Sequence, residues 1–120
     1  MANPFVHCEL ETNDVAKAKN FYGKLFDWKM EDMPMPDGTY TIINVGEGTG
    51  GGLMKNPMPN APSMWLPYVL VDDIEAATKK ARDLGGKVMK EMTPVKDMGW
   101  FSLIVDPTGA MFGLWKTAKR

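Results

Sequence analysis

The most constraining feature of this 120-residue chain is an internal repeat of secondary-structure signals. Residues 5–12 alternate in polarity as a strand does, and Asn13-Asp14 then provides a helix N-cap. Residues 66–71 again have strand character and are followed by a second N-cap, Asp72-Asp73. Because Asp14 and Asp73 stand 59 residues apart, the chain is expected to repeat one structural unit.

Both N-caps precede a segment with the periodicity of an amphipathic helix. Apolar residues recur at i, i+3, i+7 and i+10, which place them on one helical face. They are Val15, Ala18, Tyr22 and Leu25 in the first half, and Ile74, Ala77, Ala81 and Leu84 in the second. Gly85-Gly86 then ends the second helix.

Three strand-like segments follow each helix. They are 28–33, 39–45 and 51–55 in the first half, with a turn at Asp37-Gly38, and 87–92, 100–105 and 110–116 in the second, with a turn at 106–109. The last strands share a Gly-Leu-X-Lys string, at 52–55 and 113–116. The sequence therefore predicts an α+β fold in which two βαβββ modules, residues 3–56 and 64–117, are joined by the proline-rich linker 57–63 in one domain spanning 1–120.

Composition excludes several classes of protein. The net charge of −1 and the scattered basic residues give no face for nucleic acid or an anionic membrane. A single cysteine excludes an internal disulfide and a cysteine-based zinc site. No apolar run reaches the roughly 18 residues of a membrane span, and residues 1–4 lack signal-peptide character, so a cytoplasmic protein is expected.

The order of elements and several local strings resemble the vicinal oxygen chelate superfamily, which includes glyoxalase I, bleomycin-resistance and fosfomycin-resistance proteins, and extradiol dioxygenases. The strings are His7 with Asn13-Asp14, Phe-Tyr-Gly-Lys-Leu-Phe-Asp-Trp at 21–28, Val-Asp-Asp at 71–73, Leu-Gly-Gly at 84–86, and Asp-Pro-Thr-Gly at 106–109. The resemblance implies a U-shaped, cupped eight-stranded mixed sheet with helices on its convex side and a ligand site on its concave side. It also implies a homodimer.

Metal-dependent members of that family take four ligands from the first and last strands of both halves, typically His, Glu, His or Gln, and Glu. In this sequence the resemblance assigns these positions to His7, Gly52, Leu66 and Gly113. Three of the four lack a donor atom, so we expect no metal and no other cofactor. The alternative is a divalent metal held by His7 with Glu9 or Glu11 as a substitute ligand, although side chains two residues apart on a strand diverge by ~7 Å.

The two glycines have two interpretations of equal weight. Gly52 and Gly113 remove bulk and let a ligand approach the backbone closely, or they relieve crowding where the sheet curls.

One polar cluster is predicted in the cup. Alternation places Glu9 on the same face as His7, and Tyr68 is the counterpart of Glu9 in the second half. These three supply a base, an acid and a hydrogen-bond donor for catalysis or ligand contact, or they satisfy one another. The predicted ligand pocket comprises His7, Glu9, Gly52, Leu66, Tyr68 and Gly113.

Two further patterns are interpreted as structural. Residues 46–51 match Gly-x-Gly-x-x-Gly, but a strand rather than a helix follows, so a hairpin loop is expected instead of a dinucleotide site. Cys8 alternates away from His7, which favours a buried, inert thiol.

The tryptophans at 28, 65, 100 and 115 are expected in the core, at a dimer contact or in the pocket.

The function that these observations favour is metal-independent binding of a small molecule, of the glyoxalase and bleomycin-resistance type, and the sequence does not identify the ligand. One alternative is an enzyme, a lyase, isomerase or thiol transferase that uses His7 and Glu9 for metal or acid–base chemistry. A second alternative is a non-catalytic dimeric scaffold.

Overall fold

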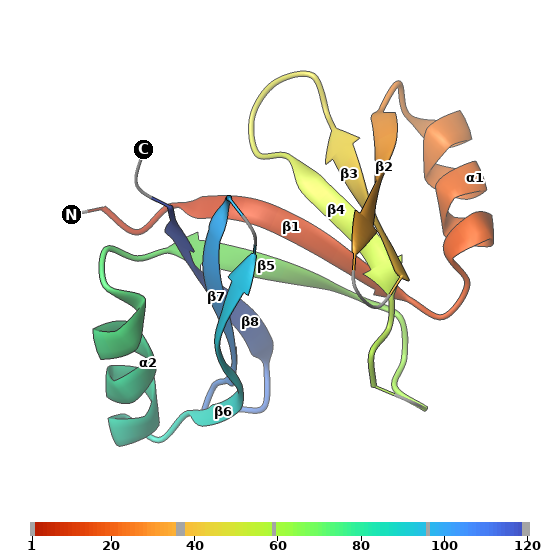
Figure 1. Ribbon diagram of the computed structural model, residues 1–120. Helices are drawn as coiled ribbons and strands as arrows, with labels where there is room; N and C mark the ends of the chain where they lie inside the picture. The colour runs from red at the N-terminus through yellow and green to blue at the C-terminus, as the bar shows by residue number, and fades with distance from the viewer. Residues whose placement is uncertain (1, 36–37, 59, 96, 119–120) are drawn as a thin grey trace. The chain divides into compact units, whose positions relative to one another are not determined.

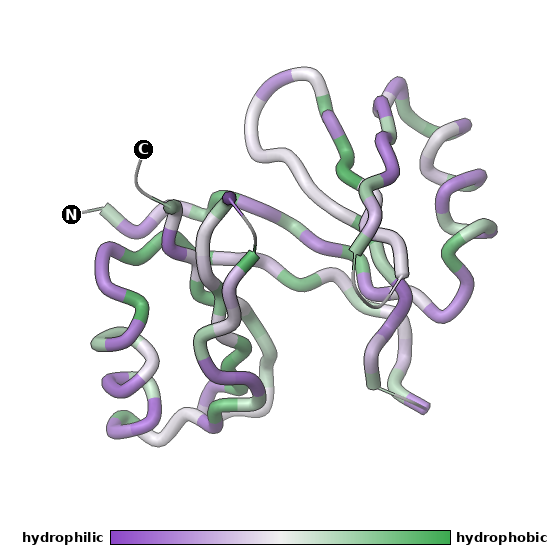
Figure 2. The backbone as a smooth tube through the Cα atoms, in the orientation of Figure 1, coloured by the Kyte–Doolittle hydropathy of each residue, from purple (hydrophilic) through white to green (hydrophobic). Residues whose placement is uncertain are grey.

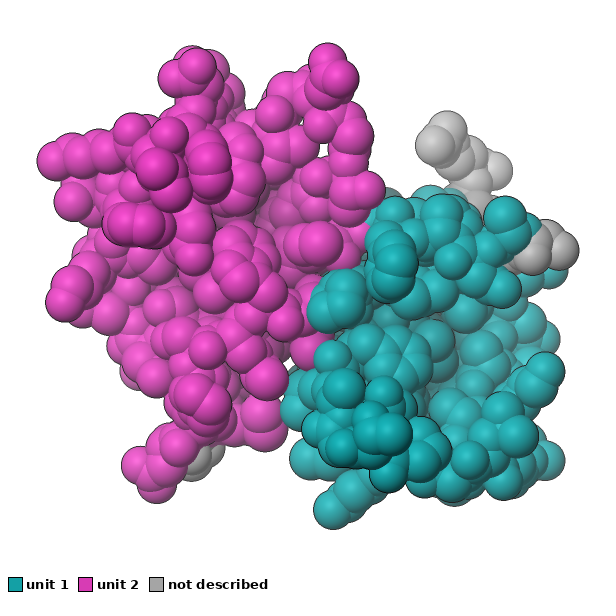
Figure 3. All heavy atoms as spheres, turned by 180° about the vertical axis from the view of Figure 1, so that it is seen from behind, with its two compact units in different colours: residues 1–6, 67–120 teal, residues 7–66 magenta. Residues whose placement is uncertain are grey.

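The computed structural model describes residues 2–35, 38–58, 60–95 and 97–118. The chain divides into two compact units, shown in Figure 3: residues 7–66 (magenta) and residues 1–6 with 67–120 (teal). They are called here the N-terminal unit and the C-terminal unit. The predicted turn residue Asp37 lies outside the described residues.

The N-terminal unit holds one helix and a four-stranded sheet (Figure 1). Its elements are β1 (Phe5–Thr12, of which the first two residues belong to the C-terminal unit), α1 (Val15–Leu25), β2 (Lys29–Met35), β3 (Gly38–Asn44) and β4 (Gly51–Lys55). The strand order is β2-β3-β4-β1. Strands β1 and β4 run parallel, while the other neighbours are antiparallel.

The C-terminal unit repeats this arrangement. Its elements are β5 (Met64–Leu70, of which the first three residues belong to the N-terminal unit), α2 (Ile74–Asp83), β6 (Lys87–Val95), β7 (Gly99–Val105) and β8 (Met111–Thr117). The order is β5-β8-β7-β6, with β5 and β8 parallel. The α+β class and the repeated βαβββ order are therefore confirmed.

Both helices begin where the sequence predicts, because an aspartate caps each of them. The Asp14 carboxylate accepts a hydrogen bond from the Lys17 backbone N–H at 3.0 Å, and Asp73 accepts one from Ala76 at 3.0 Å. Hydrophobic and hydrophilic residues alternate along both helices (Figure 2). In the N-terminal unit the buried side chains beneath α1 are Leu10, Ile43 and Leu53; in the C-terminal unit Ile74, Ile104 and Leu114 are buried, with Ala77 and Ala81 of α2 packed against them.

The last position of each predicted helical stripe is exposed, contrary to expectation. Leu25 is 55% exposed and Leu84 is 69% exposed. Leu25 is the final residue of α1, and Leu84 is the C-cap of α2. A side chain at the end of a helix lies beyond the supporting sheet, so the i+10 position does not contribute to the core.

Two strands are longer than predicted, because each continues through a proline. The predictions for β2 and β6 ended at Met33 and Met92, whereas the strands extend through Pro34 and Pro94. Both are edge strands of their units, where the missing N–H of proline removes no bond that the ladder needs.

Both helices are short, with 11 residues in α1 and 10 in α2. Within the described ranges, neither helix has the length and apolar character that crossing a bilayer requires.

Candidate functional site

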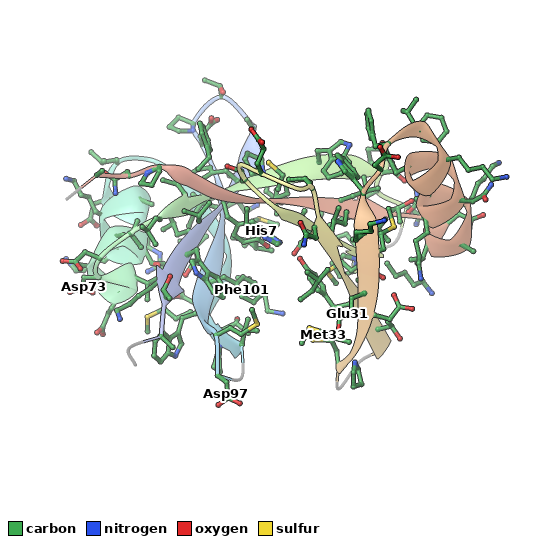
Figure 4. All side chains as sticks on the ribbon, turned by 90° about the horizontal axis from the view of Figure 1, so that it is seen from above. His7, Glu31, Met33, Asp73, Asp97 and Phe101 are labelled. Carbon is green, nitrogen blue, oxygen red and sulfur yellow. The ribbon has the colours of Figure 1, made fainter. Side chains whose placement is uncertain are left out.

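Strand β1 presents two kinds of side chain to its two faces. Leu10 belongs to the core that packs against α1, while Glu9 and Glu11 lie on the opposite face together with His7. Figure 4 labels His7 on this strand. Glu9 is 6% exposed and Glu11 is 2% exposed, so the face opposite the helix carries buried carboxylates. Buried charges of this kind require polar partners.

Tyr40 brings a third polar group to this face. It lies on β3, and Gly52 on β4 separates it from β1, since Gly52 pairs with Glu9 on one side and Ile42 on the other. A Cβ atom at position 52 would overlap the phenol ring and hydroxyl of Tyr40. Glycine at this position therefore lets the Tyr40 ring cross β4 and reach β1.

The Tyr40 hydroxyl joins His7 to Glu9. It donates a hydrogen bond to Glu9 Oε1 at 3.0 Å, and it lies 2.7 Å from His7 Nε2. Because the single hydroxyl hydrogen is directed to the carboxylate, the remaining bond requires His7 Nε2–H to donate to the tyrosine oxygen. The three side chains thus form a directed chain, from His7 to Tyr40 to Glu9.

Burial and charge fix the protonation of this chain. Burial lowers the pKa of His7 from its ordinary value of 6.5, so the imidazole is neutral at pH 7. Burial, followed by the negative charge of Glu9 and its hydrogen bond, raises the pKa of Tyr40 far above its ordinary value of 10.0. Tyr40 therefore remains a hydroxyl that can donate to Glu9 at any physiological pH.

Glu11 adds an unsatisfied acceptor beside this chain. Its Oε1 atom is buried and has no hydrogen-bond partner among the described residues. An unmade bond at a buried polar atom costs about 1–3 kcal/mol. A bound molecule that donates a hydrogen bond to Glu11 would recover this free energy.

The residues present do not fit the metal ion that the family resemblance implies. Position 52 offers no donor, and the Tyr40 ring fills the space where its side chain would lie. Glu9 and His7 are both engaged by the Tyr40 hydroxyl. Among the described residues, no three His, Cys, Asp or Glu side chains are grouped so as to hold a metal ion.

The C-terminal unit also contains a glycine–tyrosine pair, formed between β8 and β5. Gly113 on β8 pairs with Tyr68 on β5, and a Cβ atom at 113 would overlap the Tyr68 ring. Tyr68 packs edge-to-face against Phe101, with ring centroids 6.2 Å apart. The Lys90 ammonium lies 5.7 Å from the centroid of the same Phe101 ring.

The structure thus divides the predicted site residues into two groups. His7, Glu9 and Gly52 come together in the N-terminal unit, and Tyr68 and Gly113 come together in the C-terminal unit. Leu66 is fully buried at the end of the N-terminal unit. A pocket shared by both groups remains a prediction.

A cavity of about 270 Å³ lies elsewhere in the N-terminal unit. It is lined by Cys8, Trp28, Ile43, Val45, Thr49, Gly50, Gly51 and Trp65. Cys8 and Ile43 share the face of the sheet that packs against α1, so this cavity is on the opposite side from His7 and Glu9. The Cys8 thiol is partly exposed there, whereas the sequence predicted a buried thiol.

Sequence reasoning did not identify Tyr40, although a signal for it was present. Gly52 and Gly113 stand 61 residues apart, and the same offset pairs Tyr40 with Phe101. Both Tyr40 and Phe101 prove to be aromatic residues on the strand that follows β2 or β6. In the N-terminal unit this aromatic residue lies over the glycine, whereas in the C-terminal unit the ring over Gly113 is that of Tyr68.

Comparison with known proteins identifies relatives over nearly the whole chain. A model of the Glyoxalase/Bleomycin resistance protein/Dioxygenase superfamily matches residues 5–114. The chain is 37% identical over 118 residues to "Putative glyoxylase CFP32" of Mycobacterium tuberculosis, a match that covers 93% of this chain and 45% of that protein. It is 27% identical over 123 residues to the anthracycline biosynthesis protein DnrV of Streptomyces peucetius, covering 90% of this chain and 45% of that protein. The chain therefore spans less than half the length of these curated relatives.

Solved structures share the fold. The methylmalonyl-CoA epimerase of Mycobacterium tuberculosis matches with a TM-score of 0.72 at 15% identity, over 96% of this chain and 88% of that chain. A hypothetical protein of Bacillus halodurans matches with a TM-score of 0.74 at 14% identity, over 100% of this chain and 98% of that chain. At such low identity these matches show the fold alone, and they agree with the predicted fold class.

Proposed function

The chain belongs to the Glyoxalase/Bleomycin resistance protein/Dioxygenase superfamily, and on that premise we propose that it is a metal-independent small-molecule-binding domain. The observation that supports this proposal is the His7–Tyr40–Glu9 chain, which fills the implied metal site with hydrogen bonds. His7, Glu9 and Tyr40 are the proposed polar anchors for the ligand. No metal or other cofactor is required.

The proposed ligand donates hydrogen bonds and has an aromatic body. Glu11 Oε1 is a buried acceptor without a partner, so a hydroxyl or ammonium group of the ligand would satisfy it. One relative is named for anthracycline biosynthesis, which suggests hydroxylated polycyclic aromatic compounds as the ligand class. An anthracycline is therefore a suitable probe.

Fluorescence titration with an anthracycline tests this proposal. Glu11→Gln, Glu9→Gln and Tyr40→Phe should each weaken binding by about 5- to 100-fold. Each Glu→Gln change removes the negative charge and replaces one acceptor oxygen by an NH₂ donor, and Tyr40→Phe removes the hydroxyl that holds His7 and Glu9. Cys8→Ala, on the other face of the same strand, is the matched control and should leave binding unchanged. Absence of saturable binding, or equal affinity in all variants, would contradict this ligand class.

Metal titration tests the metal-free part of the proposal. Isothermal titration with Ni²⁺, Zn²⁺, Mn²⁺ and Fe²⁺ should give no stoichiometric binding to the wild-type protein. Tight binding of one ion per chain that disappears in His7→Ala would overturn this part.

Catalysis is the second candidate function, favoured by the relative named a glyoxylase. A lyase, isomerase or thiol transferase would use His7 and Glu9 for acid–base chemistry, with the Glu9 carboxylate as base held in place by the Tyr40 hydroxyl. Turnover of the hemithioacetal of an α-keto-aldehyde, abolished by Glu9→Gln, would support an enzyme. Binding without turnover would favour the first candidate.

The assembly proposed is a cytoplasmic homodimer. The curated relatives are more than twice as long as this chain, so two copies would supply a comparable length. Phe21, Leu25 and Phe26, at the C-terminal end of α1, expose apolar side chains suited to such a contact. Sedimentation equilibrium should give a dimer that Phe21→Ser with Leu25→Ser weakens. A dimer that binds neither probe would point to the scaffold alternative.

A further inference from the structure

We infer that Tyr40 occupies the space in which metal donors would converge, and that the Tyr40–Gly52 pair is what makes the N-terminal unit metal-free. The inference rests on the metal-free part of the proposed function and is independent of the identity of the ligand. It assigns a latent divalent-cation site to His7, Glu9 and position 52, which the tyrosine closes.

The first support for a latent site is the geometry around the Tyr40 hydroxyl. Its oxygen lies 2.7 Å from His7 Nε2 and 3.0 Å from Glu9 Oε1. Bonds from a first-row divalent ion to nitrogen and oxygen are ~2.0–2.2 Å long. An ion replacing the hydroxyl would therefore need the two donors to approach by less than about 1 Å, which small rotations of the side chains provide.

The second support is the direction of position 52. A Cβ atom there would point into the Tyr40 hydroxyl and its Cζ and Cε2 atoms. A carboxylate side chain at 52 would therefore approach the same space as His7 and Glu9, but from β4 instead of β1. Three donors of imidazole and carboxylate type are sufficient for a Zn²⁺ or Ni²⁺ site.

The two positions are coupled because they compete for one volume. Any side chain at 52 requires the Tyr40 ring to leave, and loss of the ring alone leaves only two protein donors. We therefore expect Gly52→Glu alone to be destabilised and Tyr40→Ala alone to bind metal weakly. The double substitution Tyr40→Ala with Gly52→Glu removes the ring from β3 and adds a carboxylate on β4. This carboxylate is the third metal donor, beside His7 and Glu9.

The decisive experiment measures metal binding by the whole chain carrying both substitutions. Isothermal titration with Zn²⁺ and Ni²⁺, and the visible absorption of bound Co²⁺, should show one ion per chain with a Kd at least 100-fold below that of the wild type. Adding His7→Ala should abolish the binding. Circular dichroism and thermal melting establish that each variant is folded.

A matched control comes from the C-terminal unit. Tyr68→Ala with Gly113→Glu makes the same kind of exchange, but the position that corresponds to His7 is Leu66, and Tyr68 itself corresponds to Glu9. This variant should bind no ion. Binding of equal strength there would show that an added carboxylate in either unit, and not the latent site, captures the metal.

A second variant keeps the test decisive if the first does not fold. Tyr40→His retains Gly52, so nothing clashes at that position, and it adds a shorter side chain with a nitrogen donor opposite His7 and Glu9. It should bind Zn²⁺ stoichiometrically. Stoichiometric metal binding by the wild type with Tyr40 in place, or failure of both folded variants to bind, would overturn the inference.

Discussion

The two units use one packing device with different chemical outcomes. In each, a glycine on the last strand lies beneath a tyrosine ring, Gly52 beneath Tyr40 and Gly113 beneath Tyr68. Tyr40 comes from β3 and crosses β4 to bond Glu9 and His7, while Tyr68 comes from β5 and packs against Phe101. The repeat thus preserves a glycine–tyrosine packing relationship, although the tyrosine comes from a different strand in each copy.

Adding a side chain to either glycine is expected to have the largest effect on stability. Gly52→Val and Gly113→Val should each lower the free energy of unfolding by ~3 kcal/mol, because each new side chain overlaps a packed tyrosine ring. Urea denaturation measures the loss. Gly23→Val is an exposed comparison, since nothing lies near a Cβ atom at position 23.

Removing the tyrosine of each unit tests whether the loss of stability comes from the overlap with its ring. Tyr40→Ala should reduce the cost of Gly52→Val but not that of Gly113→Val, and Tyr68→Ala should do the reverse. Additive costs in all four combinations would show that the glycines are needed for the backbone and not for the rings.

The hydroxyl of Tyr40 provides a smaller and more specific test. Tyr40→Phe keeps the ring over Gly52 but leaves Glu9 and His7 without their shared partner, so the free energy of unfolding should fall by ~2 kcal/mol. The control is Tyr22→Phe, which removes only a 3.3 Å bond from the exposed Trp65 indole and should cost ~0.5 kcal/mol or less. Equal losses would show that the Tyr40 hydroxyl contributes no more to the free energy of unfolding than the hydroxyl of Tyr22.

The smallest expected effect is a pH dependence of the free energy of unfolding, which arises from His7 in the N-terminal unit. His7 is the only histidine, and burial lowers its pKa below the ordinary 6.5. The unfolded chain then binds a proton more readily than the folded one, so the free energy of unfolding is retained above pH 6.5 and falls as the pH drops through the pKa of folded His7. Urea denaturation between pH 8 and pH 5, about 1.5 units on either side of the ordinary histidine value, measures the slope.

The matched variant for the pH test is His7→Gln, which should lack the slope over this range. Asp32 and Asp106 titrate below 3.8 and do not contribute there. An unchanged slope in His7→Gln would assign the effect to another group.

Much of the fold could be predicted because its signals are local. Asp14 and Asp73 cap their helices by bonds to residues three positions away, and the alternation of residues 5–12 needs no knowledge of neighbouring strands. The ends of β2 and β6 were predicted too early, before Pro34 and Pro94, because a strand tolerates proline only when it lies at the edge of a sheet. Whether a strand lies at an edge is set by the strand order of the sheet, which the sequence of the strand itself does not contain.

The site was predicted only in part for the same reason. The shared face of His7 and Glu9 follows from alternation along one strand, while Gly52, which pairs with Glu9, was assigned to the site through the family resemblance. Tyr40 reaches them only because β3, β4 and β1 are neighbours in that order. The offset of 59 residues used to find partners aligned the first strands and helices, whereas the later strands follow an offset of 61.

Pro34 and Pro94 also have a consequence for how this protein behaves in a crowded solution. Each interrupts the row of backbone donors on the outermost strand of its unit, β2 or β6. A foreign strand that paired with either edge would find an N–H missing near the end of the strand. The C-terminal end of each edge strand is therefore a poor template for the addition of a further strand.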